Sequence, residues 1–144
     1  MFKLIKKNVK FFVGNNNINK SILQPFDPDV CEFLYKLSQN IINNKITRRS
    51  PDLIAASFWC SKKNILKLKK ENKKHELRFG KGLIFHITPA NVPTNFFYSL
   101  IFGLLSGNNN IVKVPSNNFF QINIICDAIK KTVKEKKFSR VKKL

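Results

Sequence analysis

Two polar side chains stand where a short apolar run gives way to a turn. Asn91 lies in the turn Pro89-Ala-Asn-Val-Pro93, whose prolines would hold it stiffly. Its side-chain amide donates hydrogen bonds without adding charge. Lys113 lies near the carboxyl end of a second apolar run, and a lysine there can hold a phosphate as a point charge. Each has an ordinary alternative: an asparagine that satisfies the backbone of its own turn, and a solvent-exposed lysine on an edge strand.

A strand, a buried helix and a second strand are expected to position these residues. The runs Leu83–Ile87 and Ile111–Val114 are β-type. Between them, apolar residues recur at helical spacing from Phe96 to Leu105, and the remaining face is almost uncharged, which predicts a buried helix. This order predicts the start of a parallel α/β sheet. Ligands of such sheets bind where loops leave the carboxyl ends of the strands, here at 88–93 and 115–118.

Capping residues mark the ends of the expected helices. Asp27-Pro28-Asp29 and Ser50-Pro51-Asp52 are typical helix starts and predict two amphipathic helices ahead of the sheet. A break between helices is expected near Ser61. Gly107 fits the left-handed position that ends the buried helix, and Ser116 is expected to cap a last helix.

The fold class predicted is therefore α/β, the start of a Rossmann-like parallel sheet (strand-helix-strand-helix) preceded by amphipathic helices. Residues 1–27 are expected to form an amino-terminal arm with strands, and residues 28–79 a helical segment. Residues 80–130 hold the strand-helix-strand-helix unit. Residues 131–144 form a basic tail that is expected to be solvated or frayed. At 144 residues, this is one domain's worth of chain.

The composition is strongly basic. The chain has 27 Lys and Arg against 8 Asp and Glu, a formal net charge of +19, which favours nucleic acid or an anionic membrane as a partner. Lys, Asn, Ile and Phe are all abundant, so drift in an A+T-rich coding sequence is a simpler cause. Two alternative functions stay open: a small basic nucleic-acid-binding protein, with lysine-rich stretches at 62–74 and 130–143, and a peripheral membrane-binding module. No nucleic-acid motif is recognised, and no apolar run approaches the roughly 20 residues of a membrane span, so neither nucleic acid nor a transmembrane segment is expected.

The cysteines and histidines offer little chemistry of their own. Cys31, Cys60 and Cys126 have no metal-ligand spacing, so no metal site is expected, and three thiols suit a reducing cytoplasm. Cys60 and Cys126 are expected to be buried structural thiols. His86, in the middle of a strand, is expected to be half-buried and bonded to a neighbouring backbone group, with an acid or base of a substrate pocket as the alternative. His75 lies in a charged loop and is expected to be inert.

Two loops carry a resemblance to a known family. They are H-I-T-P-A-N-V-P, residues 86–93, and G-L-L-S-G-N-N-N-I-V-K-V-P-S, residues 103–116. At this separation they resemble the acyl-CoA reductase family of bacterial luminescence, the fatty-acid reductase branch of the aldehyde dehydrogenase superfamily. That superfamily has a Pro-x-Asn-x-Pro turn, then Gly-Asn, then a Lys followed by Pro-Ser. The resemblance extends to the flanks and covers roughly residues 28–130.

The resemblance implies a reaction and a set of site residues. It implies that NADPH reduces a long-chain fatty acyl-CoA to an aldehyde through a thioester with an enzyme cysteine, in an aldehyde-dehydrogenase-like domain. Asn91 matches the asparagine of the family's turn and would donate to the carbonyl oxygen as negative charge builds there. Pro89, Lys113 and Ser116 match positions that contact the cofactor. Ser116 stands where NAD-preferring members often carry a glutamate, which favours NADPH because no carboxylate repels a 2′-phosphate.

The resemblance also implies that this domain is incomplete. In the family, the nucleophilic cysteine and the glycine-rich cofactor turn lie beyond the length of this chain. We therefore expect the chain to be the amino-terminal portion of a reductase and to be inactive alone. The implied partners are fatty acyl-CoA as substrate and a fatty-acid reductase complex or a homo-oligomer as the assembly, in the cytoplasm.

Overall fold

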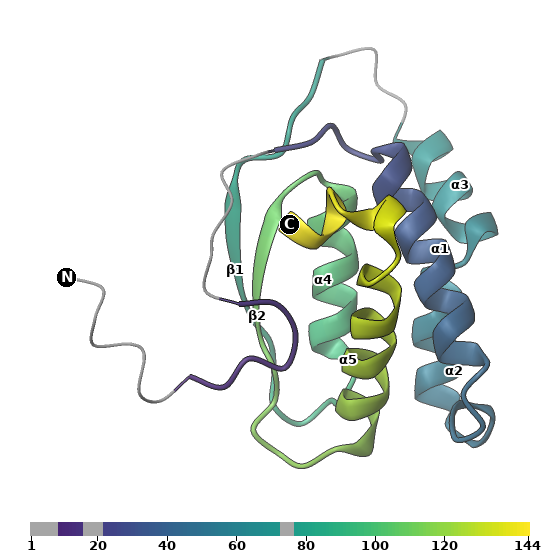
Figure 1. The fold of residues 1–144 in the computed structure, drawn as a ribbon. Coiled ribbons are helices and arrows are strands. Elements are labelled where there is room, and N and C mark those ends of the chain that lie inside the picture. Colours follow the sequence, from purple (N-terminus) through teal and green to yellow (C-terminus); the bar gives the residue numbers. More distant parts are fainter. Residues whose placement is uncertain (1–8, 16–21, 73–76) are drawn as a thin grey trace.

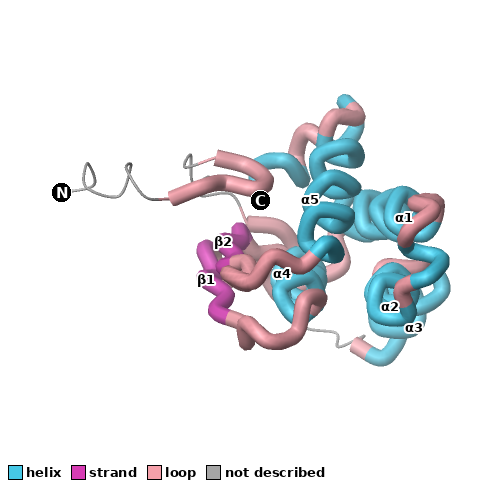
Figure 2. The backbone as a smooth tube through the Cα atoms, turned by 90° about the horizontal axis from the view of Figure 1, so that it is seen from below, coloured by secondary structure: helices cyan, strands magenta, loops and turns pink. Residues whose placement is uncertain are grey.

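The computed structural model describes residues 9–15, 22–72 and 77–144. Helices α1, α2 and α3 lie on one side of the molecule, α4 and α5 in the middle, and two strands on the other side (Figures 1 and 2). In the described part of the predicted arm, residues 9–15 and 22–27 contain no strand. The remainder of that prediction, and His75, lie outside the described residues.

The helical segment begins where the capping residues predict. Helix α1 spans Pro28–Ile42, and the Asp27 carboxylate accepts a hydrogen bond of 2.9 Å from the Asp29 N–H. A short 3-10 turn, η2 (Thr47–Arg49), leads into α2 (Pro51–Trp59). Helix α3 (Lys62–Glu71) follows, and the Ser61 hydroxyl accepts from the Asn64 N–H at its start. The predicted break near Ser61 is confirmed.

A strand-helix-strand-helix unit follows. Strand β1 spans Leu83–Ile87, α4 Asn95–Leu105, β2 Asn109–Lys113 and α5 Phe120–Val133. The two strands pair in parallel, and the α4 crossover joins them. The coarse α/β prediction is therefore confirmed as a mixed fold with a two-stranded parallel sheet.

One predicted boundary of this unit is confirmed, and two others differ from those predicted from the sequence. Gly107 has a φ of 79° and follows α4, as predicted, and an added Cβ would lie 2.2 Å from the Leu23 carbonyl oxygen. The prediction for Ser116 as a helix cap is wrong, because α5 begins only at Phe120 and its N-cap is Phe119. Strand β2 begins earlier than its apolar run, because the Asn109 N–H pairs with the Gly82 carbonyl.

The two faces of the sheet are in different environments. Helix α4 packs on one face, toward which His86 points. The other face carries apolar side chains that remain exposed: Leu83, Phe85, Ile87 and Ile111. Parallel sheets in proteins are normally covered on both faces, so an apolar face with this exposure is unusual.

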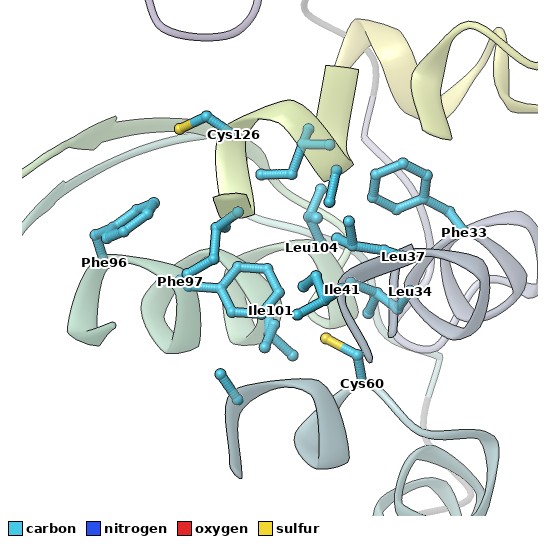
Figure 3. Close-up of a cluster of buried hydrophobic side chains, with 14 of the residues drawn as sticks. Phe33, Leu34, Leu37, Ile41, Cys60, Phe96, Phe97, Ile101, Leu104 and Cys126 are labelled. Carbon is cyan, nitrogen blue, oxygen red and sulfur yellow. The ribbon is translucent and has the colours of Figure 1, made fainter. Parts of the chain in front are cut away.

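The core lies between α1, α4 and α5. Figure 3 shows Phe97 and Ile101 of α4 against Leu37 and Ile41 of α1. Helix α4 is apolar nearly all round, as predicted, but Phe102 stays 46% exposed and makes an edge contact with the Trp59 ring.

The carboxyl-terminal basic segment is packed onto the molecule. Two 3-10 turns, η3 (Lys136–Phe138) and η4 (Val141–Lys143), follow α5. Phe138 is 1% exposed and its ring meets Phe33 edge-on at 5.5 Å. Arg140 pairs with Asp29, and Lys137 pairs with Glu32. The prediction that residues 131–144 are solvated or frayed is therefore wrong, because an apolar side chain and long-range ion pairs hold them.

Candidate functional site

The two predicted ligand loops meet at one edge of the molecule. In the parallel register Ile87 pairs with Lys113, so both strands end at the same edge. The loop after β1 and the loop after β2 start from there and lie together at the lower end of the sheet in Figure 1. The Asn117 side-chain amide donates to the Ala90 carbonyl at 3.4 Å, which joins the two loops directly.

Asn91 is exposed in the first of these loops. Its side chain has no hydrogen-bond partner within residues 9–15, 22–72 and 77–144. The turn therefore does not use the amide, whereas the ordinary alternative for this residue requires the amide to bond to the backbone of its own turn. An unused donor at a strand end is free to meet a ligand.

Ser116 lines a shallow pocket of about 250 Å³ at the start of α5. Its other walls come from the β2–α5 loop, the first turn of α5 and Phe12. Of the four predicted site residues, Ser116 alone lines this pocket. Lys113, Pro89 and Asn91 are exposed at the same edge outside it. Phe12 belongs to the amino-terminal segment, and nothing local in the sequence indicates that it packs here.

The charges at this edge favour an anion. No Asp or Glu is among the described residues that line the pocket. Lys113 forms no ion pair with any residue in the described part of the chain. The hydroxyl of Ser116 and the side-chain amides of Asn117, Asn118 and Asn123 are donors that suit a phosphate.

His86 forms a polar network that the sequence analysis missed. Its Nε2 lies 2.9 Å from Asn110 Oδ1, which can only accept, so Nε2–H donates there. In the neutral ring, Nδ1 then accepts from the Ser99 hydroxyl at 2.7 Å. The predicted bond to a backbone group is wrong, because two side chains 13 and 24 residues away hold the ring.

Gly103 makes room for this network. A Cβ there would lie 1.9 Å from Asn110 Oδ1. The network thus fixes β1 against both α4 and β2, just ahead of the loop that carries Asn91. The spacing of the four residues gives no local signal for it.

The three cysteines are poor nucleophiles in this fold. Cys60 is fully buried and points into the core (Figure 3), and burial raises the pKa of its thiol. Burial also raises the pKa of Cys126, to about 11, and that of Cys31. Both buried thiols are structural, as predicted. Within the described residues no group of His, Cys, Asp and Glu could hold a metal ion.

A comparison with known protein families shows the family of this chain. The family model described as acyl-CoA reductase (LuxC) matches residues 28–140, which is well over half of the chain. The chain belongs to the acyl-CoA reductase (LuxC) family. Nothing matches among curated proteins or among solved structures.

Family membership indicates the kind of reaction and substrate. Acyl-CoA reductases act on an acyl thioester, so the family implies an acyl-CoA substrate and a reductase reaction. The matched residues include the whole strand-helix-strand-helix unit and both loops. In the described part of the chain, no helix is long and apolar enough to cross a bilayer.

Proposed function

We propose that this chain forms the amino-terminal part of an NADPH-dependent reductase that converts long-chain fatty acyl-CoA to aldehyde through an enzyme thioester. Besides the family match, the observation that carries the proposal is the contact between Asn117 and Ala90. It joins the loop of Asn91 to the loop of Ser116, so that one ligand-binding edge can hold both the acyl group and the cofactor.

Asn91 is proposed as the donor to the carbonyl oxygen of the thioester. Attack by a thiolate and the later hydride transfer each place negative charge on that oxygen. An amide N–H aimed at it stabilises both transition states, at about 3–4 kcal/mol for one such donor. The exposed and unpaired amide of Asn91 supports this role.

NADPH is proposed to bind at the β2–α5 loop. Lys113 and Ser116 would hold the ribose and its 2′-phosphate, and Pro89 would pack against the cofactor. The donor set and the lack of a carboxylate in the pocket fit that phosphate. When bound, NADPH supplies the hydride that reduces the acyl carbon.

The nucleophile is proposed to come from polypeptide outside this sequence. The thiols of Cys60 and Cys126 are buried, and their raised pKa values leave almost no thiolate at neutral pH. Cys31 is half-buried near the start of α1, which lies at the end of the molecule opposite to the ligand loops (Figure 1). The chain alone is therefore expected to be inactive.

The open sheet supports an incomplete domain. Four apolar side chains on the face opposite α4 lie in solvent, and Ile87 is 72% exposed. The free edge of β2 is also partly engaged: the Asn110 N–H donates to the Leu144 carbonyl at 2.7 Å. A further parallel strand at that edge and helices on the open face would complete an aldehyde-dehydrogenase-like sheet. We place this enzyme in the cytoplasm, within a reductase complex or a homo-oligomer.

A chimera tests this proposal. Residues 28–144 would replace the matching segment of an intact acyl-CoA reductase of the same family, and NADPH oxidation would be followed with hexadecanoyl-CoA. The chimera should turn over, and Asn91→Ala should lower its rate about 100- to 1,000-fold. Asn43→Ala, at an exposed position after α1 and away from both loops, should have little effect. The isolated chain should give no aldehyde. A folded chimera in which Asn91→Ala is fully active, or turnover by the isolated chain, would contradict the proposal.

A further inference from the structure

Helices α2 and α3 present a second exposed surface, distant from the ligand loops. Figures 1 and 2 show the two helices stacked end to end along the side of α1. Their inner residues, such as Leu53, Ala56 and Ile65, are buried against the core. We call the outward residues the α2–α3 outer face. They are Ile54, Phe58, Lys62, Lys63, Leu66, Lys67 and Lys70.

The apolar members of this face are largely exposed. Phe58 is 58% exposed, Leu66 55% and Ile54 40%. Ile54 and Phe58 lie one helical turn apart on α2, so they share one side of that helix. Large side chains left in water in this way cost free energy unless a partner covers them.

The lysines of this face are largely without counter-charges. Only Lys67 has an acidic partner among the described residues, Glu71 at 3.8 Å. The lysine-rich carboxyl-terminal segment differs, because Asp127, Glu32 and Asp29 pair with it. Among the described residues, ion pairs therefore engage Lys130, Lys137 and Arg140 of that segment but only Lys67 of the α2–α3 outer face.

We propose that the α2–α3 outer face binds the surface of an anionic lipid bilayer. Exposed Phe and Leu side chains between lysines are typical of helices that lie in the membrane interface. The apolar side chains would enter the headgroup layer, and the long lysine side chains would reach the phosphates. The positive charges that attract lipid phosphates and the apolar side chains that enter the bilayer therefore lie on the same face.

The open sheet face is a poorer candidate for the lipid. It is more apolar, but only Lys81 and Lys113 stand at its ends. Within the described residues, the outer edge of β1 also has no backbone hydrogen bonds, and hydrocarbon would leave those groups unsatisfied. A covering layer of polypeptide suits that face, whereas the helical backbone of α2 and α3 is satisfied internally.

Vesicle sedimentation tests the proposal on the full chain. The probes are vesicles of phosphatidylcholine alone and vesicles in which a quarter of the lipid is phosphatidylserine, at low and at high salt. Binding should require phosphatidylserine and should weaken at high salt. The pair Phe58→Ser and Leu66→Ser should lower the partition coefficient about tenfold. The triple change Lys62→Glu, Lys63→Glu and Lys70→Glu should lower it about 100-fold or more.

Matched variants distinguish binding through a defined face from binding that depends only on the net charge of the chain. The triple change Lys131→Glu, Lys136→Glu and Lys142→Glu alters the net charge equally on the carboxyl-terminal surface and should reduce binding far less. The pair Phe85→Ser and Ile87→Ser removes apolar area from the sheet face and should leave binding unchanged. Circular dichroism would confirm that each variant folds.

Several results would contradict the proposal that this face binds a membrane. They are failure of the unaltered chain to bind anionic vesicles, equal losses in the two triple variants, and loss of binding in the sheet-face pair. Displacement of the chain from vesicles by RNA, with the α3 lysines required for RNA binding, would assign the face to nucleic acid instead.

Discussion

Asn91 and His86 lie close together in the sequence, yet their side chains have opposite surroundings. Asn91 is exposed and unpaired within the described residues, whereas both ring nitrogens of His86 are hydrogen-bonded. A residue with an unused donor can change without harm to the fold, and a residue in a satisfied network cannot. We therefore expect a change at Asn91 to affect ligand binding and a change at His86 to affect stability.

Replacement of Asn91 by Ala should leave the stability of the chain almost unchanged. No hydrogen bond of the described residues is lost, so the free energy of unfolding should change by less than about 0.5 kcal/mol. Urea unfolding followed by circular dichroism measures this. A loss of 2 kcal/mol, at the magnitude of a missing turn bond, would show that the amide supports the turn instead.

Gly103→Ala should destabilise the chain by about 1–3 kcal/mol, since its new methyl group would overlap Asn110 Oδ1. In an Asn110→Ala background the same change should cost clearly less, because the overlapping atom is absent. Additive effects in this double-mutant cycle, measured by urea unfolding, would contradict the packing described here.

The buried thiol of Cys126 should make the free energy of unfolding depend on pH at high pH. Burial raises its pKa from 9.0 to about 11, so the folded chain holds the thiol proton more tightly than the unfolded chain. The resulting stabilisation is fully present below pH 9 and is lost as the pH rises toward 11. The difference in unfolding free energy between the unaltered chain and Cys126→Ala should therefore shrink between those pH values. A constant difference would show that the thiol is not buried in solution.

At the scale of elements, local signals give the helix starts and long-range contacts give the rest. Pro28 and Pro51 mark their helices because capping depends on neighbouring residues. The early start of β2 depends on a bond between Asn109 and Gly82, which no apolar pattern reveals. The docked tail was missed for the same reason, since Asp29 and Arg140 are far apart in the sequence.

Phe138→Ala should destabilise the chain by about 3–5 kcal/mol, because the ring is buried against α1. Phe120→Ala, at a half-exposed position in α5, is the matched control and should cost much less. Thermal or urea unfolding compares the two. Equal small losses would show that the carboxyl-terminal segment is solvated after all.

At the scale of the whole molecule, the candidate site depends on two loops that only the parallel sheet brings together. Asn91, Lys113 and Ser116 could be predicted as site residues because their two loops resemble motifs of the family. It could not show that Ser116 shares a pocket with Phe12, or that Asn117 reaches Ala90, because both depend on packing. The open sheet face and the buried thiols are the observations behind our proposal that the nucleophile lies in other polypeptide.

The most direct test of the shared ligand edge is a nuclear magnetic resonance titration of the isolated chain with NADP⁺. The account predicts that backbone amide shifts change at residues 113–120 and at residues 88–94 together, and that NAD⁺ causes smaller changes because it lacks the 2′-phosphate. Changes confined to the lysines of α3, or no changes in either loop, would contradict it.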